Sequence, residues 1–143
     1  MKVRQLSVFL ENLSGRLAEI TGTLGDAGVN IRAFSLADTS DFGILRLVVS
    51  DIQRARAALQ DKGFTLRETE VIAIEIEDRP GGLAAILRIL GEHGVNVEYM
   101  YASLEKSSDN AVVILRPEDV DQAIATLLDH SVRLLPAERV YAL

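Results

Sequence analysis

Hydrophobic and polar residues alternate along two short stretches, one near the N-terminus and one at the middle of the chain. Residues 6–10 place leucine or valine at every second position, and residues 72–76 do the same with isoleucine. This period of two is typical of a strand with one face against a hydrophobic core. The positions between are mostly polar, so we expect the opposite face of each strand to be partly exposed to water.

A helix is predicted directly after each of these strands. Residues 17–27 carry an apolar stripe at helical spacing, and residues 83–90 carry a second one. Ser14 and Pro80 stand at matching places before the two stripes. Both favour a helix start, because serine can cap the first turn and proline suits the first helical position.

Glycines mark the ends and the interiors of these two helices. Gly28 and Gly94 are interpreted as the left-handed residues just beyond each helix end. Gly25 and Gly91 lie inside the helices, where glycine costs about 1 kcal/mol relative to alanine. We therefore expect another element, a second helix, to approach the backbone closely at Gly25 and Gly91.

The two strand-helix segments are copies of one another, 66 positions apart. The identical pairs are Gly15 and Gly81, Leu17 and Leu83, Ala18 and Ala84, Ile20 and Ile86, Leu24 and Leu90, Gly25 and Gly91, Gly28 and Gly94, Val29 and Val95, and Asn30 and Asn96. A match of this length does not arise by chance. The chain is therefore an internal repeat of about 70 residues.

The rest of each copy follows the same order of elements. Further strands are expected at 31–37, 44–49 and 64–69, a helix at 52–62, and a turn at 38–43 in copy one; the corresponding strands in copy two are 97–104, 111–115 and 132–135, with a helix at 118–130 and a turn at 105–110. Strand, helix, strand, strand, helix, strand folds as a split pair of right-handed crossovers. The expected fold class is α+β, with two ferredoxin-like βαββαβ domains whose antiparallel sheets carry the helices on one face.

The expected domains are residues 1–70 and residues 71–143. A lone unit of about 70 residues buries only about 60% of its chain surface, so we expect the two to lie side by side in one sheet of about eight strands. Residues 138–143 stand 68 positions after residues 70–75, as though a third copy began there. We expect residues 140–143 to add a strand, because an exposed apolar edge would invite aggregation.

Composition and charge exclude several classes of protein. The net charge is −6, and the fifteen Lys and Arg residues are scattered rather than gathered on a stripe, so we expect no nucleic-acid partner. No apolar run approaches the roughly 18 residues needed to span a bilayer, so no membrane partner is expected either. The chain has no cysteine, which removes disulfides and thiolate catalysis and fits a cytoplasmic protein.

The chain offers little for catalysis. It has two histidines, His93 and His130, and both fall at a predicted helix C-terminus, where a solvated cation is the simplest interpretation. We find no Ser-His-Asp set, no metal-ligand spacing and no phosphate-binding loop. We therefore expect no enzyme activity, no catalytic residues, no metal and no cofactor.

The repeated strand-loop-helix signature resembles that of ACT domains, the small ligand-sensing modules of many enzymes of amino-acid metabolism. Copy two carries it as Asp78, Arg79, Pro80, Gly81, Gly82 and Leu83, followed by Ile86, Leu90, Gly94, Asn96 and Val97; copy one carries it as Asn12, Gly15, Leu17, Ile20, Leu24, Gly28, Asn30 and Ile31. Copy one departs from the pattern at Asn12, which replaces the acid, and at Ser14, which replaces the proline. Together the copies cover nearly the whole chain.

The resemblance implies two ACT units and no attached catalytic domain. It also implies small ligands, usually amino acids, held near the loop after the first strand and the start of the second strand. The site residues that it implies are Asn12, Leu13, Ser14, Gly15, Asn30 and Ile31 in copy one, and Asp78, Arg79, Pro80, Gly81, Gly82, Leu83, Asn96 and Val97 in copy two. Some family members only hold subunits together, so the fold alone does not decide whether a ligand binds.

Two interpretations of the loops remain open. Each loop ends at a helix N-terminus, where unpaired N–H groups attract an anion such as an α-carboxylate, and the oxygen of Asn12 or Asp78 could accept from an α-ammonium. Alternatively, Gly15 and Gly81 serve only the turn, and Asp78 satisfies its own backbone. Asn30 and Asn96 have a similar alternative, because asparagine is common just after a helix end for its turn geometry.

The preferred hypothesis is a regulatory protein that senses an amino acid and modulates either a partner enzyme of amino-acid metabolism or its own homo-oligomer. The rival is a purely structural pair of domains that assembles with a partner and binds no metabolite. A distant third is an acylphosphatase-like enzyme with the same strand order. This third hypothesis is disfavoured because such a site needs an arginine in a phosphate-cradling loop, and the loops here present proline and glycine.

Overall fold

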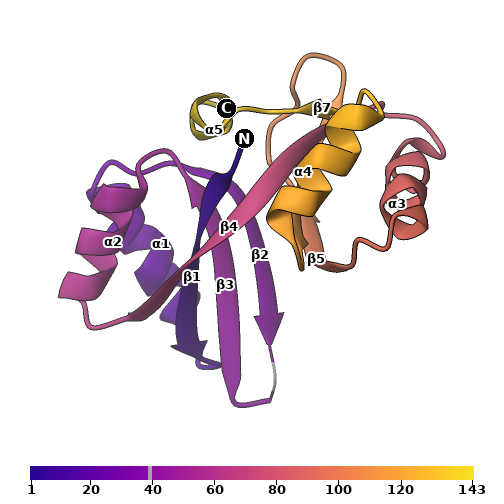
Figure 1. Cartoon of the computed structure of the whole chain (residues 1–143). Helices are drawn as coiled ribbons and strands as arrows, with labels where there is room; N and C mark the ends of the chain where they lie inside the picture. Colours follow the sequence, from indigo (N-terminus) through magenta and orange to yellow (C-terminus); the bar gives the residue numbers. More distant parts are fainter. Residues whose placement is uncertain (39) are drawn as a thin grey trace. The chain divides into compact units, whose positions relative to one another are not determined.

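The computed structural model describes residues 1–38 and 40–143, so Thr39, within the expected turn at 38–43, lies outside the described residues (Figure 1). The chain divides into two compact units. We call Arg4–Thr69 the N-terminal unit, and Met1–Val3 together with Glu70–Leu143 the C-terminal unit. Each unit is described by itself.

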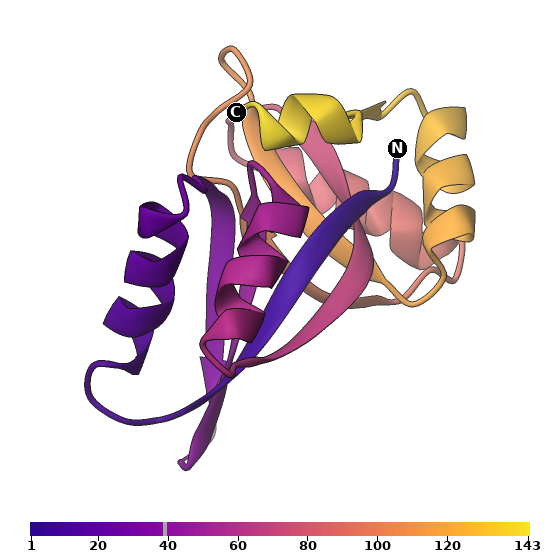
Figure 2. The same ribbon diagram turned by 90° about the vertical axis from the view of Figure 1, so that its left-hand side faces the viewer.

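The N-terminal unit has the order strand, helix, strand, strand, helix, strand. Its elements are β1 (Val3–Glu11), α1 (Arg16–Asp26), β2 (Ile31–Asp38), β3 (Phe42–Val49), α2 (Ile52–Asp61) and the first part of β4 (Thr65–Ile76). The strands are arranged as β2-β3-β1-β4, and β3 pairs antiparallel with both β1 and β2. Figures 1 and 2 show α1 and α2 on the same side of these strands.

The C-terminal unit repeats this plan, beginning with the second part of β4. Its further elements are α3 (Gly82–Glu92), β5 (Val97–Ala102), β6 (Ala111–Pro117), α4 (Val120–Asp129), β7 (Arg133–Leu134) and α5 (Ala137–Tyr141). Its strand order is β5-β6-β4, with β7 on the other side of β4, and all three pairings are antiparallel. In both units the second, third, first and fourth strands follow one another, which confirms the expected α+β fold of two βαββαβ units.

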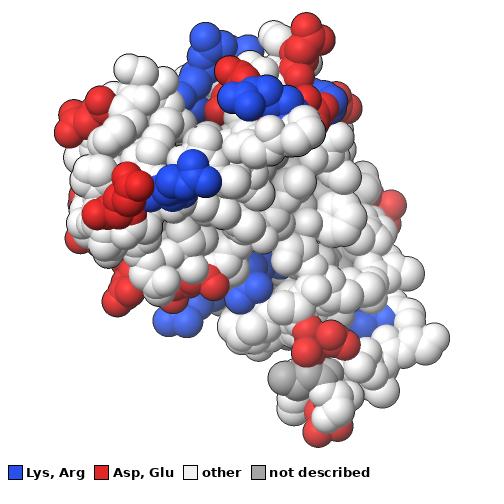
Figure 3. Space-filling view, turned by 90° about the vertical axis from the view of Figure 1, so that its right-hand side faces the viewer, with Lys and Arg blue, Asp and Glu red and all other residues white. Residues whose placement is uncertain are grey.

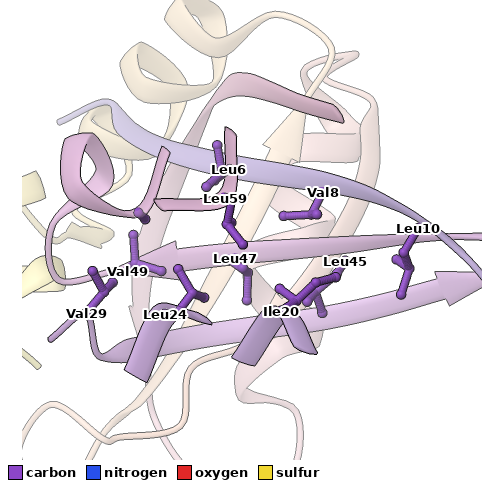
Figure 4. Packing of buried hydrophobic residues seen from close by; sticks show 11 residues of the cluster. Leu6, Val8, Leu10, Ile20, Leu24, Val29, Leu45, Leu47, Val49 and Leu59 are labelled. Atoms are coloured by element: carbon purple, nitrogen blue, oxygen red, sulfur yellow. The ribbon is translucent and has the colours of Figure 1, made fainter. Parts of the chain in front are cut away.

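The hydrophobic core of each unit lies between its sheet and its two helices. In the N-terminal unit, side chains at alternate positions of β1 and β3 point toward α1 and α2 (Figure 4). The buried members are Leu6, Val8, Leu10, Ile20, Leu24, Val29, Leu45, Leu47, Val49, Ala55 and Leu59. The register pairs Leu6 with Leu47 and Val8 with Leu45, so the period-two pattern places one continuous apolar face under both helices.

The C-terminal unit builds its core from the corresponding positions. Its buried members are Ile72, Ile74, Ile76, Ile86, Leu90, Val95, Val113, Leu115, Ala123, Leu127 and Leu134. The same parity of each strand and the same helix stripe therefore form the core in both copies, as the alternation predicted. Two departures are that residues 71–76 of β4 are buried at both parities and that Leu17 of the predicted stripe is 39% exposed. No described helix is long and apolar enough to cross a membrane.

The two first helices of the repeat begin later than the sequence indicated. Gly15 and Gly81 occupy the N-cap positions of α1 and α3 with φ of 89° and 84°, a left-handed conformation that favours glycine. Ser14 and Pro80 therefore precede the cap, and the prediction that they start the helices was wrong. The turn needs positive φ directly before the first helical residue, and neither serine nor proline adopts it readily.

The glycines inside the helices do not receive a second helix. A Cβ built on Gly25 or Gly91 would have no described heavy atom within 4 Å beyond its own helix and chain neighbours. Both residues are exposed. The expectation of a close approach was therefore wrong, because these glycines lie on the solvent side of their helices rather than on the stripe that packs against the sheet.

The C-terminal tail is a short helix rather than a strand. Pro136 forms the N-cap of α5 with φ of −65° and ψ of 151°, and Val140 is fully buried. The expected strand at residues 140–143 was wrong because the resemblance to residues 70–75 ignored Pro136, which favours a helix start. Leu135, just before this proline, donates its backbone N–H to the carbonyl of Ala73 at 2.9 Å.

The turn after the second helix predicts opposite effects in the two units. Gly63 has φ of 84°, whereas Ser131 holds the corresponding place with φ of 59°. Gly63→Ala should reduce the free energy of unfolding by about 1 kcal/mol, because left-handed geometry strains residues with a Cβ. Ser131→Gly should raise the free energy of unfolding by about 0.5 kcal/mol. The strain that glycine relieves is larger than the free-energy cost of its extra conformational entropy in the unfolded chain. Urea denaturation measures both changes, and a loss of stability in Ser131→Gly would contradict this account.

Candidate ligand sites at the strand-to-helix loops

The loop between β1 and α1 is exposed and partly hydrogen-bonded to the β2–β3 turn. Asn12 donates its backbone N–H to the carbonyl of Asp41 at 2.9 Å and its side-chain Nδ2 to the carbonyl of Ser40 at 3.3 Å. The side-chain oxygen of Asn12 accepts no hydrogen bond from the described residues. This oxygen, close to the start of α1, is therefore available to a donor from outside.

The loop between β4 and α3 carries two ion pairs. The carboxylate of Asp78 forms an ion pair with the ammonium of Lys106, and the guanidinium of Arg79 pairs with Glu77. The hydrogen bond and the charge of Asp78 raise the pKa of Lys106 above its ordinary value. Asp78 is thus not a lone carboxylate, which the sequence could not indicate because Lys106 is 28 positions away.

Gly82 is required by the shape of this loop. Its N–H donates to the carbonyl of Arg79 at 3.0 Å, and a Cβ built on it would overlap the carbonyl oxygen of Glu77. The corresponding residue of the N-terminal loop is Arg16, whose N–H donates to the carbonyl of Leu13 over a longer 3.3 Å. The C-terminal loop therefore closes more tightly onto its helix start than the N-terminal loop does.

Both helix starts leave backbone donors open. In the described part of the chain, neither α1 nor α3 has a side chain bonded to its first turn. The first N–H groups of a helix have no partner within the helix, and the positive end of its dipole favours an anion. The physical requirement for binding a carboxylate is thus met at the exposed loops that contain Gly15 and Gly81.

The other expected site residues lie at the opposite end of each helix. Asn30 and Asn96 follow helices of 11 residues, which are about 16 Å long. The backbone carbonyl of Asn30 accepts a hydrogen bond from the backbone N–H of Ser50 at 2.9 Å. The backbone carbonyl of Asn96 accepts one from the backbone N–H of Glu118, also at 2.9 Å. The asparagines therefore join the start of the second strand to the end of the third, and within one unit they are not beside the loop.

Three of the expected contacts contribute to the core instead. Ile31 packs against the N-terminal core, and Leu83 and Val97 pack against the C-terminal core. By contrast, the side chain of Leu13 is 55% exposed. Leu13 therefore remains available at the surface of the N-terminal loop, while the other three side chains are directed inward.

Sequence reasoning missed a cleft that begins at each loop. In the N-terminal unit a hollow of about 380 Å³ lies between the end of β1, the first turn of α1 and the turn from α2 to β4. In the C-terminal unit a hollow of about 330 Å³ lies at the corresponding place, and Arg79 and Gly82 of the expected site line it. The two clefts occupy equivalent places in the repeat. Phe42 pairs with Glu11 and directly precedes Gly43, and Asn110 directly precedes Ala111, which corresponds to Gly43 in the second copy.

A buried carboxylate lies beside the C-terminal cleft. The side chain of Glu75 is 3% exposed and accepts hydrogen bonds from Arg133 at 2.9 Å and from Asn110 at 3.2 Å, as well as from Ser107. Burial raises the pKa of Glu75, but these hydrogen bonds and the charge of Arg133 outweigh it and lower the pKa below its ordinary value. The expectation that the strand face opposite the core is partly wet was therefore wrong at Glu75, and also at Ala73 and at Ser7 of copy one, which are buried.

The two histidines contact one another. Their ring centroids lie 4.8 Å apart at an interplanar angle of 74°, and each Nδ1 lies 2.8 Å from a helix carbonyl, that of Ile89 for His93 and that of Thr126 for His130. The sequence interpretation as two separate solvated cations therefore overlooked an edge-to-face pair. Among the described residues no group of three or more histidines, aspartates or glutamates is placed to hold a metal ion.

Charges of both signs are interspersed on the face of the molecule that Figure 3 shows. On the face in Figure 3, Lys and Arg side chains lie among Asp and Glu side chains rather than along one basic stripe. The ion pairs that join Lys2 to Glu70 and Asp121, and Arg4 to Glu68, illustrate this mixing within each unit.

Comparison with known proteins gives consistent results. A family model described as an ACT domain pair matches residues 1–142. The crystal structure of protein BT0572 from Bacteroides thetaiotaomicron is 42% identical, with a TM-score of 0.94 over 100% of this chain and 98% of that one. The regulatory subunit of aspartate kinase from Thermus thermophilus, in its ligand-free form, has a TM-score of 0.64 and 15% identity over 88% of this chain and 91% of that chain. At this identity it supports the fold alone.

One curated protein matches part of the chain. The acetolactate synthase small subunit of Buchnera aphidicola subsp. Baizongia pistaciae (strain Bp) is 39% identical over 49 residues, which are 34% of this chain. The match spans about a third of the length of that protein, 31%. The similarity is therefore local.

Proposed function

This chain belongs to the ACT domain family as an ACT domain pair, and from this premise we propose that it is a non-catalytic regulatory protein that binds an amino acid. We propose residues 1–70 and 71–143 as the two ACT domains. Binding would modulate a partner enzyme of amino-acid metabolism or the chain's own homo-oligomer. The local similarity to an acetolactate synthase small subunit supports a role as the partner of an enzyme rather than a catalytic role.

The single observation that supports ligand binding is the uncapped helix start, which occurs twice. Each loop places a left-handed glycine, Gly15 or Gly81, directly before a helix whose first turn has no side-chain cap in the described residues. Such a start binds a carboxylate through backbone N–H groups and the helix dipole. A free α-carboxylate is the chemical group that all amino acids share, so the loops fit the ligand class that the family implies.

A structural role is the second candidate, and one observation favours it. Asp78, the expected acceptor for an α-ammonium, already has Lys106 as its partner. An ion pair of this kind could simply hold the β5–β6 loop against the start of α3. On that interpretation the pair of domains would assemble with a partner and bind no metabolite.

Calorimetric titration of the purified chain with each of the twenty amino acids separates the two candidates. We expect saturable heat for at least one amino acid, because the open donors of the loops are complementary to a carboxylate. Absence of heat with all twenty at millimolar concentration would support the structural role instead. The protein should be dialysed into low salt beforehand, because screening weakens exposed charge interactions.

The same titration tests the role of Asp78 in the bound state. If its carboxylate meets the ammonium of the ligand, Asp78→Asn should weaken binding about five- to thirtyfold. Loss of the charged acceptor should cost about 1–2 kcal/mol of binding free energy. Asn12→Ala should have a smaller effect, because a neutral amide accepts more weakly. Lys106→Gln is the matched variant, and it should tighten binding by leaving Asp78 unpaired. Equal losses in Asp78→Asn and Asn12→Ala, or tighter binding in Asp78→Asn, would contradict this role.

A further inference from the structure

The two histidines of the chain come from the ends of two different helices of the C-terminal unit. His93 is the C-cap of α3, and His130 is the C-cap of α4. Because β4 and β6, which precede these helices, are antiparallel, the helices run in opposite directions, and Gln122 at the beginning of α4 donates its side-chain Nε2 to the backbone carbonyl of His93 at 3.2 Å. Each ring turns back by one helical turn toward its own helix, so the two rings meet between α3 and α4.

Backbone carbonyls fix the tautomer of both rings. Nδ1 of His93 lies 2.8 Å from the carbonyl oxygen of Ile89, and Nδ1 of His130 lies 2.8 Å from that of Thr126. A carbonyl oxygen can only accept, so Nδ1 carries the proton in each ring, and Nε2 of the neutral imidazole keeps its lone pair. Histidines that bind metal ions have this same arrangement, in which the other ring N–H donates to a carbonyl or a carboxylate.

The separation of the two rings fits two ligands of one metal ion. A metal–nitrogen bond of about 2.0–2.1 Å places the centre of an imidazole roughly 3.2 Å from the ion, so two neighbouring ligands at about 90–110° hold their ring centres about 4.5–5.2 Å apart. The centroids of His93 and His130 are 4.8 Å apart. The two helices therefore already hold the rings at the distance that chelation requires.

The surroundings of the rings suit a cation that keeps part of its water. Both histidines follow the negative end of a helix dipole, and neither α3 nor α4 has a lysine or arginine in its last turn. Both histidines are exposed, so water can reach the ion. No third histidine, aspartate or glutamate is placed with them among the described residues. We therefore expect reversible binding that is weaker than in a closed site of four protein ligands.

We propose that His93 and His130 together bind one divalent transition-metal ion through their Nε2 atoms, and that this ion joins α3 to α4. Imidazole nitrogen suits Zn²⁺, Ni²⁺ and Cu²⁺, whereas Mg²⁺ and Ca²⁺ prefer oxygen ligands. The corresponding positions of copy one are Ala27 and Lys62, so the N-terminal unit has no equivalent pair. The proposal does not depend on amino-acid binding at the strand-to-helix loops.

Calorimetric titration of the full chain with Zn²⁺, Ni²⁺, Cu²⁺ and Mg²⁺ tests the proposal, with protein that carries no polyhistidine tag. Wild type is expected to bind one transition-metal ion per chain, Cu²⁺ most tightly, and to bind no Mg²⁺. His93→Gln and His130→Gln should each weaken Zn²⁺ binding about tenfold or more, because loss of a ligand costs at least as much as loss of an outer-shell partner. Both side chains are exposed, so these substitutions are compatible with folding.

Lys62→Gln is the matched control, since Lys62 holds the place of His130 in copy one. This variant is expected to bind Zn²⁺ as wild type does. NMR of the imidazole nitrogens locates the ion: Zn²⁺ should shift Nε2 of both rings and leave Nδ1 of both rings protonated. Zn²⁺ should also raise the Tm of wild type and of Lys62→Gln but not that of the two histidine variants, because an ion bound to the folded state stabilises it.

Four outcomes would overturn the proposal. They are wild-type Zn²⁺ affinity in either histidine variant, a response from only one ring in the NMR spectrum, one ion bound per two chains, and Mg²⁺ binding as tight as that of Zn²⁺. One ion per two chains would mean that histidines of two copies share the metal, and tight Mg²⁺ binding would mean that carboxylates are the ligands. None of these results changes the expectation for amino acids at the loops, so the two proposals fail separately.

Discussion

Gly82→Ala is expected to reduce the free energy of unfolding by about 2 kcal/mol, because forced overpacking typically costs 1–3 kcal/mol. The added Cβ would overlap the carbonyl oxygen of Glu77 and lie about 3.3 Å from its carbonyl carbon. Both atoms belong to the backbone, so the clash is not relieved by rotating a side chain. The start of α3 and the loop must instead move apart. Urea denaturation followed by circular dichroism measures the loss.

Gly91→Ala is the matched control in the same helix. A Cβ there would meet no described atom within 4 Å outside its own helix and its chain neighbours. Alanine should therefore stabilise the protein by about 1 kcal/mol, the usual difference between alanine and glycine in a helix interior. Equal effects of the two substitutions would show that the carbonyl of Glu77 does not constrain position 82. The displaced loop should also weaken amino-acid binding in Gly82→Ala but not in Gly91→Ala.

Glu75→Gln is expected to reduce the free energy of unfolding at pH 7 by about 2 kcal/mol. Hydrogen bonds to a charged group contribute roughly 1.5–3 kcal/mol, and the buried carboxylate accepts from Arg133, Asn110 and Ser107. The contribution of Arg133 is at the low end because its side chain is 71% exposed and therefore screened by solvent. Chemical denaturation at pH 7 measures the difference.

The effect of Glu75 depends on pH in a defined direction. Its pKa is lowered in the folded protein, so its contribution is complete above the unfolded value of about 4.3 and is lost as the pH falls through the lower folded value. The stability difference between wild type and Glu75→Gln should therefore shrink below about pH 4. Glu77→Gln is the control, because the Glu77 side chain is 67% exposed and its pair with Arg79 is screened. A difference that grows on acidification would contradict this account.

The repeat and the periodicity determined the fold from the sequence. Alternation in residues 6–10 and 72–76, together with a helical stripe after each, was sufficient to predict which parity of each strand packs against the helices. These patterns are local, because the period of side chains along a strand or helix follows from backbone geometry alone. The loops containing Gly15 and Gly81 were located for the same reason.

The chemistry of the candidate sites required contacts between distant residues. The β1–β3 register brings Phe42 opposite Glu11, and the hollow then joins this pair to Phe64, more than fifty positions after β1 begins. Lys106 reaches Asp78, and Arg133 reaches Glu75, across 28 and 58 positions. No local period encodes such pairs, since each depends on strand register and loop path. The sequence by itself therefore determined the repeated βαββαβ plan, while only the tertiary structure decided where the helices begin, which charges are already paired and which residues line each cleft.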